Sequence, residues 1–342
     1  MPNKILTNAI DRLASGFDLK EEEAAAVLEQ IMSGRSSEVQ TAGFLVALRT
    51  KGETVGEIVG LAKAMRKFSK KVNLAGMDLV DTCGTGGDKS GSFNISTTAA
   101  FVVAGAQARV AKHGNRSATS QCGSADVLEA LGANLDMRPA KVGGIVRRVG
   151  IGFMFAPLHH QAMKHVIPVR QELGVRTIFN FLGPLTNPAG ATRQLVGVSD
   201  AGYLEVIAGA LRQLGCRHGL VVHGSDGLDE ITVTGQTDII EVGPRKFKRF
   251  SIKPDDFGLR TVTGGRQLKG GDAAKNAGIL KEVLGGKTGP RREVVILNAG
   301  AALYASGRAP SIAAGVKLAA KSIDSGQAAR KLEAYIKATR AA

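Results

Sequence analysis

The segment Asp81-Thr82-Cys83-Gly84-Thr85-Gly86-Gly87-Asp88 decides the fold of this chain. A short apolar run, Leu79-Val80, leads into it, and Asn94-Ile95-Ser96-Thr97 then opens a helical pattern. Three glycines in four positions let the backbone come close to a ligand, so that consecutive N–H groups can converge on phosphate oxygens. The order of strand, glycine loop and helix start predicts an α/β domain with a phosphate-binding loop. The loop matches neither a Walker motif nor a dinucleotide fingerprint.

Strand-like and helix-like segments alternate after this loop. Such alternation is typical of an α/β domain with a mostly parallel central sheet. The expected strands lie at 108–111, 151–155, 195–198, 220–223, 231–233 and 238–242. The expected helices lie at 97–105, 126–131, 140–149, 201–214 and 290–305.

The N-terminal part has helical patterns only. Residues 19–32 place apolar side chains at helical spacing. Ser37-x-x-Gln40 and Thr54-x-x-Glu57 are capping-box patterns that start two further helices. We therefore expect a small all-helical domain at 1–72, joined by a returning helical segment near 164–183. A large α/β domain is expected at 73–342.

The composition is that of an ordinary folded protein, since 44% of the 342 residues are hydrophobic and 22% are charged. No apolar run approaches the ~20 residues that span a bilayer, and the N-terminus lacks the pattern of a signal peptide. Cys83, Cys122 and Cys216 are odd in number and widely spaced, which fits neither a disulfide framework nor a zinc site. These features predict a cytoplasmic protein with no membrane partner.

The formal net charge of +15 is consistent with polyanionic partners. Nucleic acid is one such class, but no aromatic residues are interleaved with the cations as in a single-strand stacking platform. The lack of interleaved aromatic residues argues against a nucleic-acid partner, and we interpret the cations as solvated surface that helps to steer a small anionic substrate.

A second polar cluster, Lys112 to Ser120, follows the expected strand at 108–111. Its nine residues include two cations, an imidazole, an amide and three hydroxyls. Open α/β sheets bind ligands at this end of their strands, and a cation beside hydroxyl and backbone donors suits a phosphate. Ser124 begins a further turn into a helix. Taken alone, the cluster is also compatible with a polar surface loop.

Two adjacent carboxylates, Asp229-Glu230, follow a later strand. Mg²⁺ takes oxygen ligands and is usually shared with substrate phosphates. The pair therefore predicts a magnesium site, although a turn with two solvated acids fits the pattern equally well.

Residues 157–188 combine histidines, arginines and apolar side chains. The planar guanidinium of an arginine such as Arg170 can bind both oxygens of a carboxylate on an aromatic ring. His159, His160 and His165 lack the spacing of a zinc site. No serine, cysteine or threonine nucleophile with a plausible base stands out. That pattern suits displacement at a ribose C1 bearing pyrophosphate, where positioning and electrostatics do most of the work.

Together these segments resemble the anthranilate phosphoribosyltransferase family. The matching stretches run in chain order over nearly the whole sequence, at 81–88, 94–97, 112–116, 123–131, 168–170, 176–188 and 229–230. The resemblance implies a helical domain and an α/β domain, the fold that the family shares with pyrimidine nucleoside phosphorylases, and a homodimer formed through the helical domain. It also implies magnesium-dependent transfer of a phosphoribosyl group from 5-phosphoribosyl 1-pyrophosphate to the amine of anthranilate in tryptophan biosynthesis.

The resemblance further assigns roles to residues. Those implied for phosphoribosyl pyrophosphate are Gly84, Gly87, Asp88, Ser92, Asn94, Ile95, Ser96, Thr97, Lys112, His113, Gly114, Asn115, Arg116, Ser117, Ala118, Thr119, Ser120 and Ser124. Those implied for anthranilate are Gly84, His113, Asn115, Arg170 and Pro184, of which His113, Asn115 and Arg170 act by positioning rather than as acid or base. One or two Mg²⁺ ions would be served by Ser96, Asp229 and Glu230.

The sequence departs from the family pattern at several positions. Lys89 stands for the usual Gly, Ser92 for Thr, and Gln161 for Pro, and residues 119–122 read Thr-Ser-Gln-Cys in place of Ser-Ser-Lys-Ser. Lys89 and Gln121 could retune phosphate affinity, and Gln161 could alter the anthranilate entrance. Two alternatives stay open: a pyrimidine nucleoside phosphorylase on the same fold, and a catalytically silent relative that binds nucleic acid.

Overall fold

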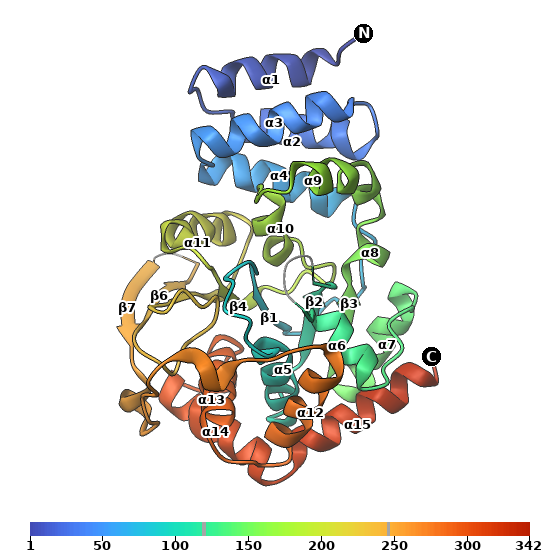
Figure 1. Cartoon of the computed structure of the whole chain (residues 1–342). Coiled ribbons are helices and arrows are strands. Elements are labelled where there is room, and N and C mark those ends of the chain that lie inside the picture. The colour runs from blue at the N-terminus through green and yellow to red at the C-terminus, as the bar shows by residue number, and fades with distance from the viewer. Residues whose placement is uncertain (118–120, 245–246) are drawn as a thin grey trace.

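The computed structural model describes residues 1–117, 121–244 and 247–342. Figure 1 shows a stack of N-terminal helices above a larger α/β unit, with a group of short helices between them. The expected fold class, a small helical part and a large α/β part around a mostly parallel sheet, is confirmed. Within the described residues, no helix is both long and apolar enough to cross a bilayer.

Four helices form the N-terminal stack, α1 (Lys4–Ala14), α2 (Glu21–Met32), α3 (Glu38–Lys51) and α4 (Val55–Lys67). Helix α4 begins with the expected capping box, in which Thr54 and Glu57 each accept the other's backbone N–H. The box expected at Ser37 is only half formed. Ser37 accepts the Gln40 N–H at 3.2 Å, but the Gln40 side chain bonds the backbone of Asn3. Gln40 thereby links α3 to α1 instead of closing its own cap.

A seven-stranded sheet with the order β3-β2-β1-β4-β5-β6-β7 forms the centre of the α/β unit. The first five strands in this order are parallel, and β6 and β7 run antiparallel to their neighbours. Because β1 lies between β2 and β4, the chain leaves β1 at a point where the strand order reverses, which is where open α/β sheets bind ligands. The strands are β1 (Val80–Gly84), β2 (Val110–Gly114), β3 (Ile151–Phe155), β4 (Arg193–Gly197), β5 (His218–Gly224), β6 (Thr237–Val242) and β7 (Phe247–Ile252).

One strand prediction near the sheet edge was wrong, and one strand was not predicted. Residues 231–233 form no strand, because the side-chain amide of Asn298 donates to the Ile231 carbonyl and accepts the Ile231 N–H. This amide replaces the neighbouring strand that the apolar pattern suggested. Strand β7 was not predicted, because its alternating pattern carries Lys248 and Arg249 on an exposed edge.

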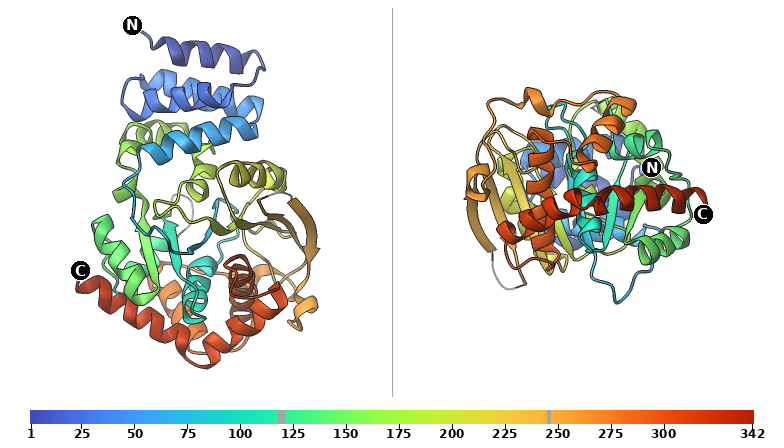
Figure 2. Two further views of the ribbon diagram at one scale, coloured as in Figure 1. Left: turned by 180° about the vertical axis from the view of Figure 1, so that it is seen from behind. Right: turned by 90° about the horizontal axis from the view of Figure 1, so that it is seen from below.

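Helices pack on the sheet around one large apolar core. Helix α5, which follows the glycine loop, is buried along almost its whole length and packs against α13 and α15. Figure 2 shows the C-terminal helices gathered at the end of the molecule opposite the N-terminal stack. The helices of this unit are α5 (Ile95–Gly105), α6 (Ser124–Ala130), α7 (Pro139–Val149), α11 (Leu204–Gln213), α12 (Ala273–Leu284), α13 (Pro290–Ala305), α14 (Ile312–Asp324) and α15 (Gln327–Arg340). Short 3-10 turns are η2 (Ala201–Tyr203), η3 (Pro254–Phe257) and η4 (Gly265–Leu268).

The connecting group between the two parts consists of α8 (Ala156–His159), η1 (Gln161–His165), α9 (Ile167–Leu173) and α10 (Phe179–Leu185). Helix α9 packs against α3, and Val166, Val169 and Phe181 share one apolar cluster with the N-terminal helices. The same cluster continues into α11 and β5 through Leu204 and Val221. One apolar cluster thus contains residues from both sides of the predicted domain boundary at residue 72. The predicted domain bounds and the returning segment stay predictions.

Candidate active site

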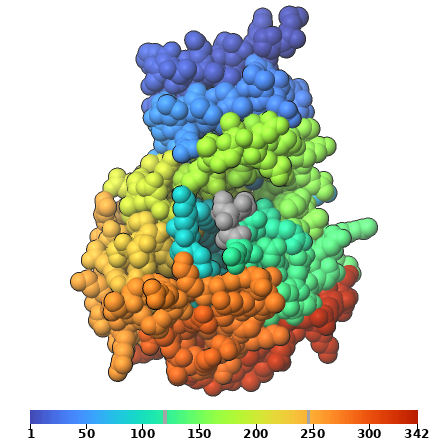
Figure 3. Space-filling model, viewed as in Figure 1, coloured from blue at the N-terminus to red at the C-terminus, as the bar shows by residue number. Residues whose placement is uncertain are grey.

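One large cleft, of about 1150 Å³, opens at the carboxyl ends of β1 and β2 and beneath the connecting helices. Figure 3 shows this hollow between the glycine-loop segment in cyan and the green connecting segment above it. Every described residue that the resemblance assigned to a substrate or metal lines the cleft. Ala118, Thr119 and Ser120, also assigned to phosphoribosyl pyrophosphate, lie outside the described residues.

The glycine loop is held against Asp229. The Gly86 N–H donates to Asp229 Oδ2 at 2.6 Å, and a Cβ at Gly84 would collide with the same carboxylate. Gly86 and Gly87 have φ values of 71° and 75°, in the left-handed region that glycine adopts readily. The glycines are therefore required both for close approach and for backbone conformation.

Three carboxyl groups meet beside this loop. Glu230 Oε1 accepts the Ser96 N–H at 3.0 Å, and Asp88 lies close enough to Asp229 to interact with its carboxyl. Burial raises the pKa of both Asp229 and Glu230, and each is raised further by a neighbouring carboxylate, Asp88 for Asp229 and Asp229 for Glu230. A cation would relieve this crowding of like charges.

The donor set suits a hard divalent cation. Asp88 Oδ2 is buried and has no hydrogen-bond partner among the described residues, and all nearby ligands are oxygens. In the part of the chain that the structure describes, no three His, Cys, Asp or Glu side chains form a ready metal cage. Such a site would need substrate oxygens to complete it, as is usual for Mg²⁺ bound with phosphates.

Lys112 lies in the middle of β2 with its ammonium turned towards β1 and α5. It donates to the Thr82 carbonyl and to Ser96 Oγ at 3.3 Å. The fully buried Asp81 accepts the His113 N–H at 3.2 Å and the Asn187 amide at 2.7 Å. Burial raises the pKa of Asp81, although Lys112 opposes the shift. This network fixes the start of the second polar loop.

Arg116 lines the cleft, but its guanidinium is already engaged. It pairs with Asp126 at 2.9 Å and with Glu129 at 2.5 Å, both on α6. The Ser117 N–H also donates to Asp126, at 3.2 Å. These contacts tie the loop after β2 to α6, so any contact of Arg116 with a phosphate would compete with two carboxylates.

Buried histidines line the part of the cleft next to the connecting helices. His113 Nδ1 lies 3.1 Å from the Gly183 carbonyl, which can only accept, so this nitrogen carries the proton. His113 Nε2 is then an acceptor, and it is buried without a hydrogen-bond partner among the described residues. Burial lowers the pKa of His113 to about 3 and that of His160 to about 4. Both imidazoles are therefore neutral at pH 7.

Arg170 completes this side of the cleft. Its guanidinium lies over the Phe179 ring, 5.6 Å from the centroid, and burial lowers its pKa. Pro184 lines the cleft close by. The combination of a half-buried cation, an aromatic face and apolar ring walls can hold an aromatic carboxylate.

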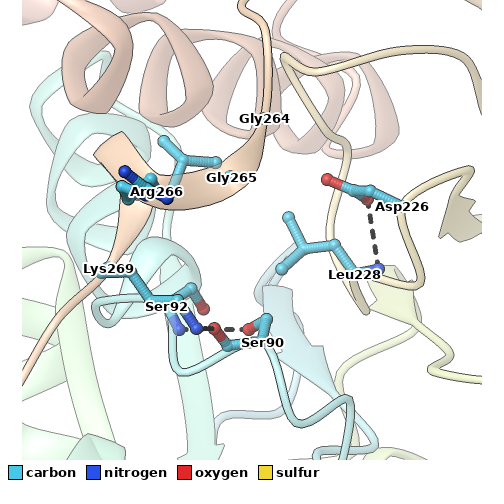
Figure 4. Close-up of a pocket in the computed structure, with 9 residues that line it drawn as sticks. Ser90, Ser92, Asp226, Leu228, Gly264, Gly265, Arg266 and Lys269 are labelled. Carbon is cyan, nitrogen blue, oxygen red and sulfur yellow. Dashed lines mark hydrogen bonds between the residues drawn. The ribbon is translucent and has the colours of Figure 1, made fainter.

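The sequence interpretation missed the contribution of residues 269–276. Lys269, Gly270, Gly271 and Asn276 line the cleft, and the Lys269 ammonium donates to the Ser90 carbonyl. The only local signal was the glycine pair, which is compatible with an ordinary turn. Figure 4 shows a smaller pocket of about 430 Å³ beside this segment, which shares Ser90, Ser92 and Lys269 with the main cleft.

Known families and curated proteins match both parts of the chain. Residues 76–329 match the glycosyl transferase family, a/b domain, and residues 7–69 match the glycosyl transferase family, helical bundle domain. The anthranilate phosphoribosyltransferase of Rubrobacter xylanophilus is 55% identical over 338 residues and covers 98% of each chain. That of Symbiobacterium thermophilum is 52% identical over 322 residues and covers 94% of each.

Solved structures resemble the whole fold. The anthranilate phosphoribosyltransferase from Thermus thermophilus aligns with a TM-score of 0.92 at 45% identity, covering 97% of this chain and 99% of that one. The enzyme from Saccharomyces cerevisiae in complex with PRPP and Mg aligns with a TM-score of 0.90 at 29% identity, covering 98% of both chains. The similarity therefore extends over the helical stack, the sheet and the connecting helices.

Proposed function

Because this chain belongs to the anthranilate phosphoribosyltransferases of the glycosyl transferase family, we propose that its cleft binds both substrates of that reaction side by side. The chain transfers the phosphoribosyl group of 5-phosphoribosyl 1-pyrophosphate to the amine of anthranilate. The products are N-(5-phosphoribosyl)anthranilate and pyrophosphate, and the reaction belongs to tryptophan biosynthesis.

The observation that carries the proposal is the division of one cleft into two chemically different parts. Hydroxyl, amide, ammonium and backbone N–H donors surround the glycine loop, whereas a half-buried guanidinium and apolar rings lie under the connecting helices. We assign the diphosphorylated ribose to the residues that the resemblance gave it within 84–97 and 112–117, to Ser124, and to 118–120 outside the described residues. We assign anthranilate to Gly84, His113, Asn115, Arg170 and Pro184.

Mg²⁺ is proposed as the cofactor, because the donor set fits it and the Saccharomyces cerevisiae enzyme is described in complex with PRPP and Mg. Asp229 and Glu230 would hold it, with Ser96 nearby, and one or two ions are compatible with the acidic cluster. When bound, the ion neutralises the pyrophosphate and makes it a better leaving group.

The chain's own residues act by holding and orienting groups. Arg170 would pair with the anthranilate carboxylate, and this contact would turn the amine towards the ribose C1. His113 Nε2 is a buried acceptor without a partner among the described residues, and it would accept a hydrogen bond from the amine. The amine's electron pair then forms the C1–N bond as the C1–O bond to pyrophosphate breaks, and the configuration at C1 inverts. The nitrogen then loses one proton to the released pyrophosphate or to water, which leaves the neutral secondary amine of the product.

Loss of anthranilate fluorescence tests the function directly. Purified protein with phosphoribosyl pyrophosphate and Mg²⁺ should consume anthranilate, and omission of any one component should stop the reaction. If anthranilate is not consumed at any protein concentration, the chain does not have this activity. Phosphorolysis of thymidine or uridine would instead favour a nucleoside phosphorylase, and salt-sensitive DNA binding without turnover would favour a silent relative.

Assembly and location are further predictions. A homodimer through the helical stack is consistent with exposed apolar side chains on α1 and α3, among them Ile5, Val39 and Val46. Light scattering should give a molecular mass twice that of the chain. Charged substitutions at Val39 and Val46 should lower this mass if the exposed apolar face of α1 and α3 is the interface. A cytoplasmic location would be tested by fractionation of the native cells.

A further inference from the structure

The segment Leu268–Asn276 is attached to residues 90–94, which precede helix α5 in the proposed phosphoribosyl site. The Phe93 N–H donates to the Leu268 carbonyl at 3.0 Å, and the Gly270 N–H donates to the Gly91 carbonyl at 2.9 Å. Ser92 and Lys269 form an antiparallel bridge between these bonds and lie side by side in Figure 4. A segment almost two hundred residues away in sequence thus fixes the backbone that carries Asn94.

Asn276 ends this attachment with its side chain. It lies in the first turn of α12, it is 2% exposed, and its Nδ2 donates to Asn94 Oδ1 at 3.0 Å. The Gly271 N–H donates to Asn276 Oδ1 at 2.9 Å, and the Asn94 Nδ2 donates to the Cys122 carbonyl at 3.2 Å. Two side-chain amides are therefore linked in series between two backbone groups.

The backbone groups at the two ends determine how both amides are turned. The oxygen and nitrogen of an amide look alike in outline, so its orientation must be inferred from its partners. A backbone N–H can only donate, so the Gly271 N–H requires Asn276 Oδ1 on its side. A backbone carbonyl can only accept, so the Cys122 carbonyl requires Asn94 Nδ2 on its side. The Asn276–Asn94 bond is the one that satisfies both ends.

The orientation of Asn94 matters for an anion. Asn94 lines the cleft, and its NH₂ group has two N–H bonds, one of which is used by the Cys122 carbonyl. The second remains for a ligand. Its Oδ1 already accepts from Asn276 and, at 3.5 Å, from the Cys122 thiol. If the amide were turned over, a carbonyl oxygen would replace the donor, and it would repel phosphate oxygens.

We propose that Asn276 is a positioning residue that holds the Asn94 amide with its NH₂ group available to phosphoribosyl pyrophosphate. This inference rests on the proposed placement of that substrate beside Asn94. Asn276 acts through Asn94, so its effect falls on the affinity for phosphoribosyl pyrophosphate and not on that for anthranilate.

Two substitutions at Asn276 test the role. Asn276→Ala removes the donor, so Asn94 can turn over and the KM for phosphoribosyl pyrophosphate should rise about tenfold, a typical effect of one charge-assisted hydrogen bond. Asn276→Asp keeps the shape and the acceptor for the Gly271 N–H but draws the Asn94 NH₂ group towards itself, and should raise the same KM at least as much. In both variants the KM for anthranilate should change less than twofold. Asn134→Ala, which removes an exposed amide that bonds the Asp136 N–H, is the control and should change neither KM.

A double-mutant cycle separates positioning from general structural support. In an Asn94→Ala background there is no amide to orient, so Asn276→Ala should change the KM for phosphoribosyl pyrophosphate less than twofold. A full tenfold effect in that background would overturn the proposal, as would a rise caused by Asn276→Asp but not by Asn276→Ala. Turnover by the wild-type protein in the same assay supports the proposed function whether or not the role of Asn276 is confirmed.

Discussion

The two sides of the cleft are built in different ways. The phosphate wall (residues 84–97, 112–117 and 229–230) comes from strand ends, and backbone or side-chain partners engage many of its polar atoms. The acceptor wall (residues 156–184) comes from short connecting helices and includes the buried His160 and the half-buried Arg170. His113 joins the two walls through its bond to the Gly183 carbonyl.

In the part of the chain that the structure describes, the acceptor wall has more buried polar atoms without hydrogen bonds than the phosphate wall. His159 Nε2 and both nitrogens of His160 are buried without a hydrogen bond of ordinary geometry among the described residues, although the Thr186 backbone is near enough to His160 to affect its pKa. An unsatisfied buried polar group costs about 1–3 kcal/mol. Most polar atoms of the phosphate wall are thus bonded, with Asp88 Oδ2 and His113 Nε2 as exceptions, whereas His160 of the acceptor wall lines the cleft with two nitrogens that a ligand can satisfy. Four predictions test this contrast.

The largest effect is expected at the acidic pair of the phosphate wall. Asp229→Asn with Glu230→Gln keeps the side-chain shapes and the acceptors for the Gly86 and Ser96 N–H groups but removes both charges. The kcat/KM should fall about 10³-fold, or about 4 kcal/mol, because the pyrophosphate loses its neutralising ion.

The measurement is a Mg²⁺ titration of the fluorescence assay with wild type and the double variant. Asp238→Asn is the matched control, since this partly exposed carboxylate on β6 bonds Ser251 and lies outside the cleft. Turnover of the double variant within threefold of wild type would show that the pair does not serve the metal.

The next effect concerns the acceptor wall and acid stability. Burial, then His159, lowers the pKa of His160 to about 4 from an ordinary 6.5. The unfolded chain therefore binds this proton more readily, and the contribution to stability is complete above pH 6.5 and is lost as the pH falls towards 4. By pH 5 the loss amounts to about 2 kcal/mol.

Urea unfolding at pH 7.5 and pH 5.0 measures this loss. His160→Leu should reduce the difference between the two pH values by about 2 kcal/mol. His113 and His159 remain in the variant, so part of the acid sensitivity should persist. His165→Leu removes an exposed imidazole and should leave the difference as in wild type. If the free energy of unfolding changed between pH 7.5 and pH 5.0 by the same amount in His160→Leu and in wild type, His160 would not be the source of this acid sensitivity.

A third effect separates the two substrates. Arg170→Ala should raise the KM for anthranilate about 30-fold, or about 2 kcal/mol, because it removes a charge-assisted contact with the carboxylate. The KM for phosphoribosyl pyrophosphate should stay within twofold, since Arg170 belongs to the acceptor wall. Arg170→Lys keeps the charge without the planar fork, so its KM for anthranilate should lie between those of wild type and Arg170→Ala. An unchanged KM for anthranilate in Arg170→Ala would remove this residue from the pocket.

The two walls also differ in how far the sequence predicts them. The phosphate wall consists of contiguous motifs at strand ends, and parallel strands bring such ends together, so residues 84–88, 94–97 and 112–117 could be grouped before the fold was known. In the acceptor wall the sequence predicted Arg170 as a ligand for a carboxylate, but it did not predict which side chains are buried around it. The burial that makes His113 and His160 neutral depends on helices that pack over them.

Long-range side-chain contacts set the limit of prediction. The apolar run at 231–233 suggested a strand, but Asn298, 67 residues away, takes both backbone groups of Ile231. The contact between Asn276 and Asn94 joins residues 182 positions apart, and no periodic pattern marks it. Such partners are specified by tertiary packing, which a local reading of propensity and spacing does not contain.

The smallest effect is expected at Lys89, where the sequence departs from the family's usual glycine. Lys89 has a φ of 56°, in the region that disfavours residues with a Cβ by about 1 kcal/mol, and it lines the phosphate wall. Lys89→Gly should stabilise the fold by somewhat less than this, because glycine also gains freedom in the unfolded chain. Loss of the exposed ammonium should raise the KM for phosphoribosyl pyrophosphate about twofold at low salt and less at high salt.

Gln107 offers the matched control for Lys89. Its φ of 67° is also in the left-handed region, but it lies in the turn after α5, outside the cleft. Gln107→Gly should therefore give a similar gain in stability with no change in either KM. Thermal unfolding and the salt dependence of KM measure the two effects separately. A KM change in both variants would show that backbone strain, and not the Lys89 charge, acts on the phosphate wall. A change confined to Lys89→Gly would show that the Lys89 charge adjusts the affinity of an already organised phosphate site.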